Sequence, residues 1–288
     1  MGLFSRLKTG FVLSVASLRV LGSHPKLAVY PLISGIATTV FALALLGPLF
    51  LVSGGDPGPV EAIGLFVVLF GTTFIASLFN AGLVYSVGEV FRGNDPSVRR
   101  GLGAASSQAG ILLVWSFISA VVGVIIRALE SRGEIGARIA AMIFSVGWAI
   151  TTFFVIPVIV FEDVSPKSMF TRSASVFTDT WGETAGAKLG LGIIPALIMF
   201  GGIALAALVA FALPTTATFV TAVVIAVGAF VVSVLVNGVI TAVAKTALYV
   251  YATESIEPEE FRDFDFESLF EDGDSSGRGG LGSATRGI

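Results

Sequence analysis

The chain has 288 residues, of which 55% are hydrophobic and only 13% are charged. Soluble domains usually carry about 25% charged residues, so this composition excludes that class and indicates an integral membrane protein. The absence of cysteine and the single histidine, His24, exclude disulfides, thiolate or multi-histidine metal sites and cysteine nucleophiles. The formal net charge of −3 conceals an acidic C-terminal segment, which holds ten of the twenty acidic residues.

Residues 3–21 form the first predicted element. Apolar residues recur there at helical spacing with three bases among them, which is typical of an amphipathic helix lying in the membrane interface. The alternative is a helix that packs on the membrane domain from the cytosol. The apolar positions are Leu3, Leu7, Phe11, Val15 and Leu18, and the bases are Arg6, Lys8 and Arg19. The turn His24-Pro25-Lys26 then ends this helix, because proline interrupts helical hydrogen bonding.

Six apolar runs are long enough to cross the hydrocarbon core of a bilayer, which takes about 20 helical residues. They cover residues 27–52, 60–91, 108–129, 138–161, 188–213 and 216–250. We therefore expect an all-α, polytopic membrane protein with a six-span domain over residues 1–253 and an acidic, largely disordered tail over 254–288. Cytoplasmic interfacial helices are expected at residues 3–22, 95–107 and 165–181.

The distribution of lysine and arginine predicts the orientation, because cytoplasmic loops of membrane proteins are enriched in these residues. With the N-terminus inside, fourteen of the seventeen bases fall on the cytoplasmic side. Only Arg127, Arg132 and Arg138 fall outside, where Glu130 and Glu134 can balance them. We expect a multi-pass protein of the plasma membrane with both termini in the cytoplasm.

The second and sixth spans are longer than a membrane requires. The second corresponds to about 48 Å of helix, against a hydrocarbon core of about 30 Å. Each span carries an asparagine followed by a charge: Asn80 and Glu89 in the second, Asn237 and Lys245 in the sixth. We predict that these helices pack side by side, with the asparagines at similar depth and Glu89 paired with Lys245. Alternatively, each charged side chain reaches water on its own.

The centres of the spans contain no ionisable residue, which argues against a catalytic or proton-relay site there. Serine, threonine and asparagine side chains remain, and these commonly form hydrogen bonds between helices. A polar permeation path lined by Asn80, Asn237 and threonines is the alternative. We predict no catalytic, cofactor-binding or metal-ligating residue. The single histidine has no serine nucleophile near it, which argues against a hydrolytic triad. Neither of the two Gly-x-Gly runs follows a strand, which argues against a dinucleotide-binding site.

The interval Glu162–Glu183 is the longest polar stretch between apolar runs. Ser165-Pro166 is a favourable helix start, with serine at the cap and proline at the first position. The helix that follows keeps Arg172 in water and places Trp181 at the depth of the lipid headgroups. Glu183 is expected to pair with Arg172 or Lys188. These features predict a second interfacial helix leading into the fifth span.

The tail interleaves acidic residues with aromatic ones. Phe261, Phe264, Phe266 and Phe270 stand among the acids between Glu254 and Asp274. Such a segment can form a short helix or bind a protein partner, and the alternative is a solvated tail without a partner.

Two stretches carry a resemblance to known proteins. The run from Pro157 through Trp181-Gly182-Glu183, together with Leu27–Pro31 after His24-Pro25-Lys26, resembles an uncharacterised family of prokaryotic six-span membrane proteins, a domain of unknown function. More distantly, the chain is similar to the membrane domain attached to some glycerophosphodiester phosphodiesterases. The resemblance covers residues 1 to about 253 and implies a membrane-embedded helical domain with no established activity. No phosphodiesterase catalytic domain accompanies it, so that activity is not carried over.

We expect a non-enzymatic membrane scaffold or membrane-organising module. Its partners would be the bilayer, with anionic headgroups against the interfacial helices, and a protein partner at the tail, but no nucleic acid. A transporter or channel for a small or lipidic solute is the second hypothesis. An enzyme that acts on lipid through Glu162, Asp163 or Glu183 is the third.

Overall fold

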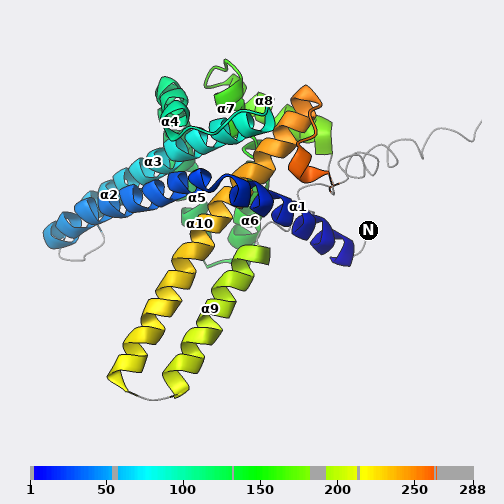
Figure 1. Ribbon diagram of the computed structural model, residues 1–288. Helices are drawn as coiled ribbons and strands as arrows, with labels where there is room; N and C mark the ends of the chain where they lie inside the picture. Colours follow the sequence, from blue (N-terminus) through cyan, green and yellow to red (C-terminus); the bar gives the residue numbers. More distant parts are fainter. Residues whose placement is uncertain are drawn as a thin grey trace, which may run out of the picture. The chain divides into compact units, whose positions relative to one another are not determined.

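The computed structural model describes residues 3–53, 58–131, 133–181, 193–212, 215–262 and 264, and these residues form helices and no strand. The first half contains α1 (Leu3–Ser23), the 3-10 helix η1 (Pro25–Ala28), α2 (Val29–Ser53), α3 (Pro59–Phe91), α4 (Val98–Ser107) and α5 (Ala109–Glu130). The second half contains α6 (Ile135–Thr151), α7 (Val155–Phe161), α8 (Ser168–Trp181), α9 (Ile193–Ala212), α10 (Thr216–Glu254) and the 3-10 helix η3 (Glu259–Phe261) (Figure 1). The predicted all-α fold is confirmed.

Among the described residues, six segments are long and apolar enough to cross a membrane, which confirms the predicted number of spans. They are Pro25–Leu51, Pro59–Phe91, Ala109–Glu130, Ile135–Phe161, Ile194–Phe211 and Thr216–Glu254. The predicted polar helices at 3–21, 95–107 and 165–181 correspond to α1, α4 and α8. The six apolar helices indicate a multi-pass membrane protein.

The chain divides into two compact units. Unit 1 comprises Met1–Ser23 and Ser175–Ile288, and unit 2 comprises His24–Ala174. Unit 1 therefore contains α1, α9, α10 and η3, and unit 2 contains α2 to α7 with the first half of α8.

In unit 2, α3 packs against α2, α4, α5 and α7, whereas α6 packs against α5. Burial along α3 is uneven. Its C-terminal part is buried at most positions from Ala81 to Val90, while Val60 and Ile63 near its N-terminus are exposed. Apolar side chains exposed on membrane-spanning helices contact lipid, so the fully buried part of α3 lies mainly at its C-terminal end.

The fourth span of unit 2 differs from the expected continuous helix. It is divided between α6 and α7, and the break falls at residues 152–154. Phe154 is fully buried there, and its backbone N–H donates to the Ser173 hydroxyl over 3.1 Å. A backbone donor freed inside a membrane must find a partner. The Ser173 hydroxyl on α8 supplies one, so α8 stabilises the break.

In unit 1, α9 and α10 form a hairpin (Figure 1). Thr215 caps α10 through a capping box with Thr218. The Ser233 hydroxyl of α10 donates to the Pro195 carbonyl oxygen of α9 over 2.7 Å, and this hydrogen bond helps to set the register of the two apolar helices. Hydrogen bonds of this kind join membrane helices at small energetic gain but with defined geometry.

The C-terminus of α10 is followed by a short return of the chain onto α1. Ser255 adopts a left-handed conformation with φ of 54° and ends α10. The 3-10 helix η3 then packs against α1, and Phe261 and Phe264 are buried. The first part of the acidic-aromatic segment is therefore folded, with its aromatic side chains covered.

Candidate membrane-interface site

Two glycines and a tyrosine form the junction of α2, α3 and α4 in unit 2. The Tyr30 hydroxyl lies 2.5 Å from the Ser86 hydroxyl, and both side chains are buried. A Cβ atom on Gly101 of α4 would lie 2.7 Å from the carbonyl oxygen of Gly82 on α3, closer than real Cβ atoms approach an oxygen. Only glycine at position 101 allows α4 to lie this close to α3. Within the Gly101-Leu102-Gly103 run, Gly101 is thus the position that permits close helix packing, whereas a Cβ atom on Gly103 would meet nothing within 4 Å.

The N-terminus of α4 is held by capping and by charge. The Ser97 hydroxyl accepts from the Arg100 backbone N–H over 3.5 Å, as expected of serine at a helix N-cap. The Arg100 side chain lies 3.6 Å from the Glu89 carboxylate of α3 and donates to the Asp95 carbonyl oxygen over 2.9 Å. Because more than half of the Arg100 side chain is exposed, this ion pair orients α4 more than it stabilises it.

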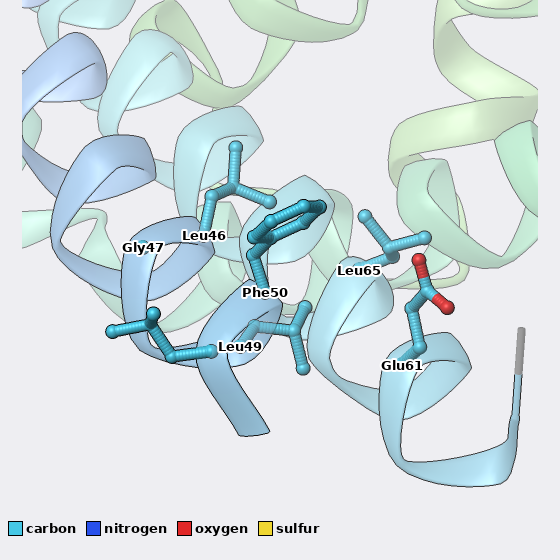
Figure 2. A pocket seen from close by; sticks show the side chains of 7 residues that line it. Leu46, Gly47, Leu49, Phe50, Glu61 and Leu65 are labelled. Atoms are coloured by element: carbon cyan, nitrogen blue, oxygen red, sulfur yellow. The ribbon is translucent and has the colours of Figure 1, made fainter. Parts of the chain in front are cut away.

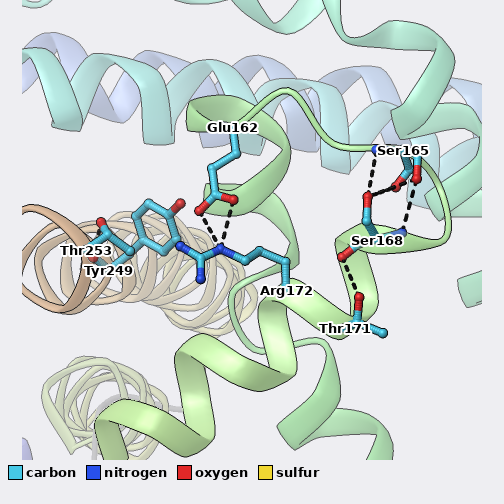
Figure 3. A network of polar contacts seen from close by, with 7 residues as sticks. All are labelled: Glu162, Ser165, Ser168, Thr171, Arg172, Tyr249 and Thr253. Carbon is cyan, nitrogen blue, oxygen red and sulfur yellow. Dashed lines mark hydrogen bonds and ion pairs between the residues drawn. The ribbon is translucent and has the colours of Figure 1, made fainter.

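The α8 segment is anchored by a second ion pair, between Arg172 and Glu162 (Figure 3). The Arg172 Nε lies 2.9 Å from both Glu162 carboxylate oxygens, and both side chains are partly exposed. Ser165 and Ser168 bond reciprocally, with the Ser168 N–H donating to the Ser165 hydroxyl over 3.2 Å and the Ser165 N–H to the Ser168 hydroxyl over 2.9 Å. This arrangement is a capping box, and it confirms Ser165 as the helix cap.

Aromatic side chains attach α8 to the neighbouring spans of unit 2. The indole rings of Trp115 on α5 and Trp148 on α6 are stacked with centroids 5.9 Å apart, and the Phe170 ring of α8 lies about 6 Å from each. The Trp115 indole N–H donates to the Ser77 hydroxyl of α3 over 3.2 Å. Tryptophan favours the membrane interface, where its ring is apolar and its N–H finds a polar partner.

These contacts gather bases at one end of unit 2, which we call the α4 end. Arg92 at the C-terminus of α3 lies over the Phe161 ring at the C-terminus of α7, 5.1 Å from its centroid, so both helices end there. The α4 end carries six bases (Lys26, Arg92, Arg99, Arg100, Lys167 and Arg172) and four acids (Glu89, Asp95, Glu162 and Asp163). The opposite end, which we call the Glu61 end, carries two described bases (Arg127 and Arg138) and three described acids (Glu61, Glu130 and Glu134). The described charges of unit 2 are therefore asymmetric.

In unit 1, α1 has two apolar faces. Leu13, Ala16 and Val20 are buried in a helix that packs on α10, while Phe11 and Leu18 are 45% and 37% exposed. The sequence stripe that predicted an interfacial helix contains these exposed side chains. A helix held on the protein by one face can insert the other into the headgroup region.

A model of DUF6159, a family of unknown function, matches residues 59–257, more than half of the chain. The chain belongs to the DUF6159 family. The matched range begins with α3 and ends just beyond α10, so it includes α4, α8 and the polar contacts around them. No curated protein and no solved structure matches this DUF6159 protein.

Two of the predicted site residues of the DUF6159 protein form ion pairs within unit 2. Glu89 pairs with Arg100, and Arg172 pairs with Glu162. Asn80 and Asn237 are exposed, and Lys245 is half-buried. The predicted Asn80–Asn237 and Glu89–Lys245 pairs join residues of different units, and they stay predictions. Glu183 and the side chain of Trp181 lie outside the described residues, as does the predicted Glu183–Arg172 pair.

Sequence reasoning missed Tyr30, Ser86, Gly101 and Ser173, which join helices of unit 2 through buried contacts. The Gly101-Leu102-Gly103 spacing was a usable signal, because small residues in apolar surroundings mark close helix packing. Nothing local marks Ser173 or Tyr30, whose partners lie 19 and 56 residues away. The described residues contain no cluster of three or more histidine, aspartate or glutamate side chains that could hold a metal ion.

Proposed function

We propose that this DUF6159 protein is a non-enzymatic, membrane-organising module of a prokaryotic plasma membrane, with both termini in the cytoplasm. The charge asymmetry of unit 2 carries the proposal. Six bases against four acids stand at the α4 end, on short helices that are fixed by capping, ion pairs and aromatic contacts. Cytoplasmic ends of membrane proteins are enriched in lysine and arginine, and each such base near an anionic leaflet contributes about 1 kcal/mol of attraction.

The exposed apolar face of α1 supports the same function. Phe11 and Leu18 are exposed beside Arg19, which is the pattern by which an amphipathic helix enters an anionic interface. We propose that α1, α4 and α8 each bind anionic headgroups, and that the acidic segment after α10 is available to a protein partner. We also propose that the chain is distantly related to the membrane domain of glycerophosphodiester phosphodiesterases.

The test reconstitutes the full chain in bilayers and measures its association with spin-labelled phosphatidylglycerol and phosphatidylcholine. Replacing Lys26, Arg99 and Lys167 with glutamine should lower the preference for the anionic lipid at least about threefold. Added salt should lower it too, because exposed charges are screened. The control variant replaces Arg127 and Arg138, at the Glu61 end, with glutamine. It should leave the preference for the anionic lipid unchanged. Equal preference of the wild type for both lipids, or equal losses in both variants, contradicts the proposal.

A transporter or channel is the second candidate, favoured by the exposure of Asn80 and Asn237 within membrane-spanning helices. An amide facing lipid is costly, so exposed asparagines favour a polar path or a polar partner. Solute flux into proteoliposomes that is lost in both Asn80→Leu and Asn237→Leu would support this function over the scaffold.

A further inference from the structure

A cavity of about 550 Å³ lies at the Glu61 end of unit 2, between the end of α2 and the start of α3 (Figure 2). Its lining is apolar except for one side chain. Leu46, Gly47, Leu49, Phe50 and Leu51 of α2 face Glu61 and Leu65 of α3 across it. Because both helices are membrane-spanning, this cavity lies on the part of the protein that contacts lipid.

Glu61 brings a carboxylate to this cavity without a protein partner for one of its oxygens. The Oε2 atom is buried and has no hydrogen-bond partner among the described residues. The position of Glu61 in the first turn of α3 favours a negative charge, because a helix N-terminus carries a partial positive charge. That field does not supply a hydrogen bond to Oε2, and a buried carboxylate oxygen without a donor is costly. A ligand that donates a hydrogen bond to the Glu61 carboxylate would offset this cost.

The depth of the lining residues matches the two parts of a lipid molecule. Glu61 lies in the first turn of α3, at the rim of the membrane, and Leu65 lies one turn deeper. On α2, Leu51 lies near the helix end and Leu46 lies deeper. Phe50 and Leu51 are 68% and 83% exposed, so the cavity opens sideways to the lipid. A carboxylate at the rim above an apolar groove is complementary to a cationic headgroup above an acyl chain.

Gly47 widens the groove. A Cβ atom at this position would meet nothing within 4 Å, so the absence of a side chain leaves open space beside α2. Larger residues at position 47 would fill this space without straining the backbone. Gly47 therefore offers a way to close the cavity while Glu61 stays intact.

We propose that this cavity binds a phospholipid whose headgroup ends in a primary amine. The ammonium group donates a hydrogen bond to the Glu61 carboxylate, and an acyl chain lies against Leu46, Leu49 and Leu65. A choline headgroup carries the same positive charge but has no N–H to donate, and a glycerol headgroup has no cation. Hydrogen bonds between charged groups are about twice as strong as neutral ones, so the amine lipid is selected over both.

The test titrates the full-length protein in detergent with ethanolamine, choline and glycerol phospholipids of identical acyl chains. Native mass spectrometry measures the binding of one lipid molecule to the protein. The ethanolamine lipid should bind about tenfold more tightly than the choline lipid. Glu61→Gln should reduce this difference to less than about twofold. Glu130→Gln removes an exposed carboxylate from the same end of unit 2 and should leave the difference unchanged. Gly47→Leu should weaken the binding of the ethanolamine lipid to the level of the choline lipid.

Equal binding of ethanolamine and choline lipids by the wild type overturns the proposal, as does a preference that persists in Glu61→Gln. If Glu61→Gln does not fold, Gly47→Leu and the wild-type comparison still decide the outcome. A second copy of the chain is the competing occupant. Dimers that are insensitive to lipid and lost in Gly47→Leu would show that the cavity is a subunit interface. Because the proposed function depends on the α4 end, either proposal can fail without the other.

Discussion

The two ends of α3 satisfy their polar groups in different ways. At the α4 end, the Ser86 hydroxyl bonds Tyr30 and the Glu89 carboxylate pairs with Arg100, so neighbouring helices supply the partners. At the other end, the Glu61 carboxylate lies at an open, apolar cavity with one oxygen unpartnered among the described residues. The difference separates an end where packing supplies the polar partners from an end where we propose that a ligand supplies one.

The largest expected effect breaks the packing at the α4 end. Gly101→Ala should lower the free energy of unfolding by about 2 to 3 kcal/mol, because the added methyl group would overlap the Gly82 backbone and force α4 away from α3. Gly103→Ala is the matched control, since a Cβ atom there meets nothing within 4 Å and alanine favours a helix. Unfolding by sodium dodecyl sulfate in mixed micelles measures both variants. Equal stability of the two would contradict the close approach of α3 and α4.

A smaller effect tests the buried hydroxyl pair at the same end. Tyr30→Phe should cost about 1 kcal/mol, because the Ser86 hydroxyl loses its partner. If the two hydroxyls act as a pair, the double variant Tyr30→Phe/Ser86→Ala should cost less than the sum of the single variants. The same unfolding titration gives all four corners of this double-mutant cycle. Additive losses would mean that the two hydroxyls do not depend on each other.

The smallest expected effect concerns the Glu61 end and tests the contrast between the two ends of α3. In detergent without amine lipid, Glu61→Gln should lower the free energy of unfolding by no more than about 0.5 kcal/mol, because no protein hydrogen bond to the buried oxygen is lost. Adding an ethanolamine lipid should stabilise the wild type and not the variant, since a ligand that binds only the folded state stabilises it. A large loss of stability in Glu61→Gln without lipid would reveal a protein partner for this carboxylate.

Hydropathy predicted the six spans because each contains a local run of about 20 apolar residues, which is the length of helix that crosses the hydrocarbon core of a bilayer. The amphipathic pattern of residues 3–21 predicted α1, although it indicated only the exposed apolar face. The buried face, with Leu13, Ala16 and Val20, is rich in small residues and looks unremarkable until α10 packs against it. The break at residues 152–154 could not be predicted, because its acceptor is Ser173 on another helix.

The sequence by itself determined the membrane class, the number of spans and the positions of the polar helices, since all of these follow from composition and local periodicity. The tertiary structure decided which polar groups have partners and which do not. Gly101 is necessary only because Gly82 and Tyr30 lie against it, and Glu61 is unusual only because the end of α2 surrounds it with apolar side chains. These contacts form when helices pack and bring together residues that are far apart in the chain. The local sequence pattern does not contain that information.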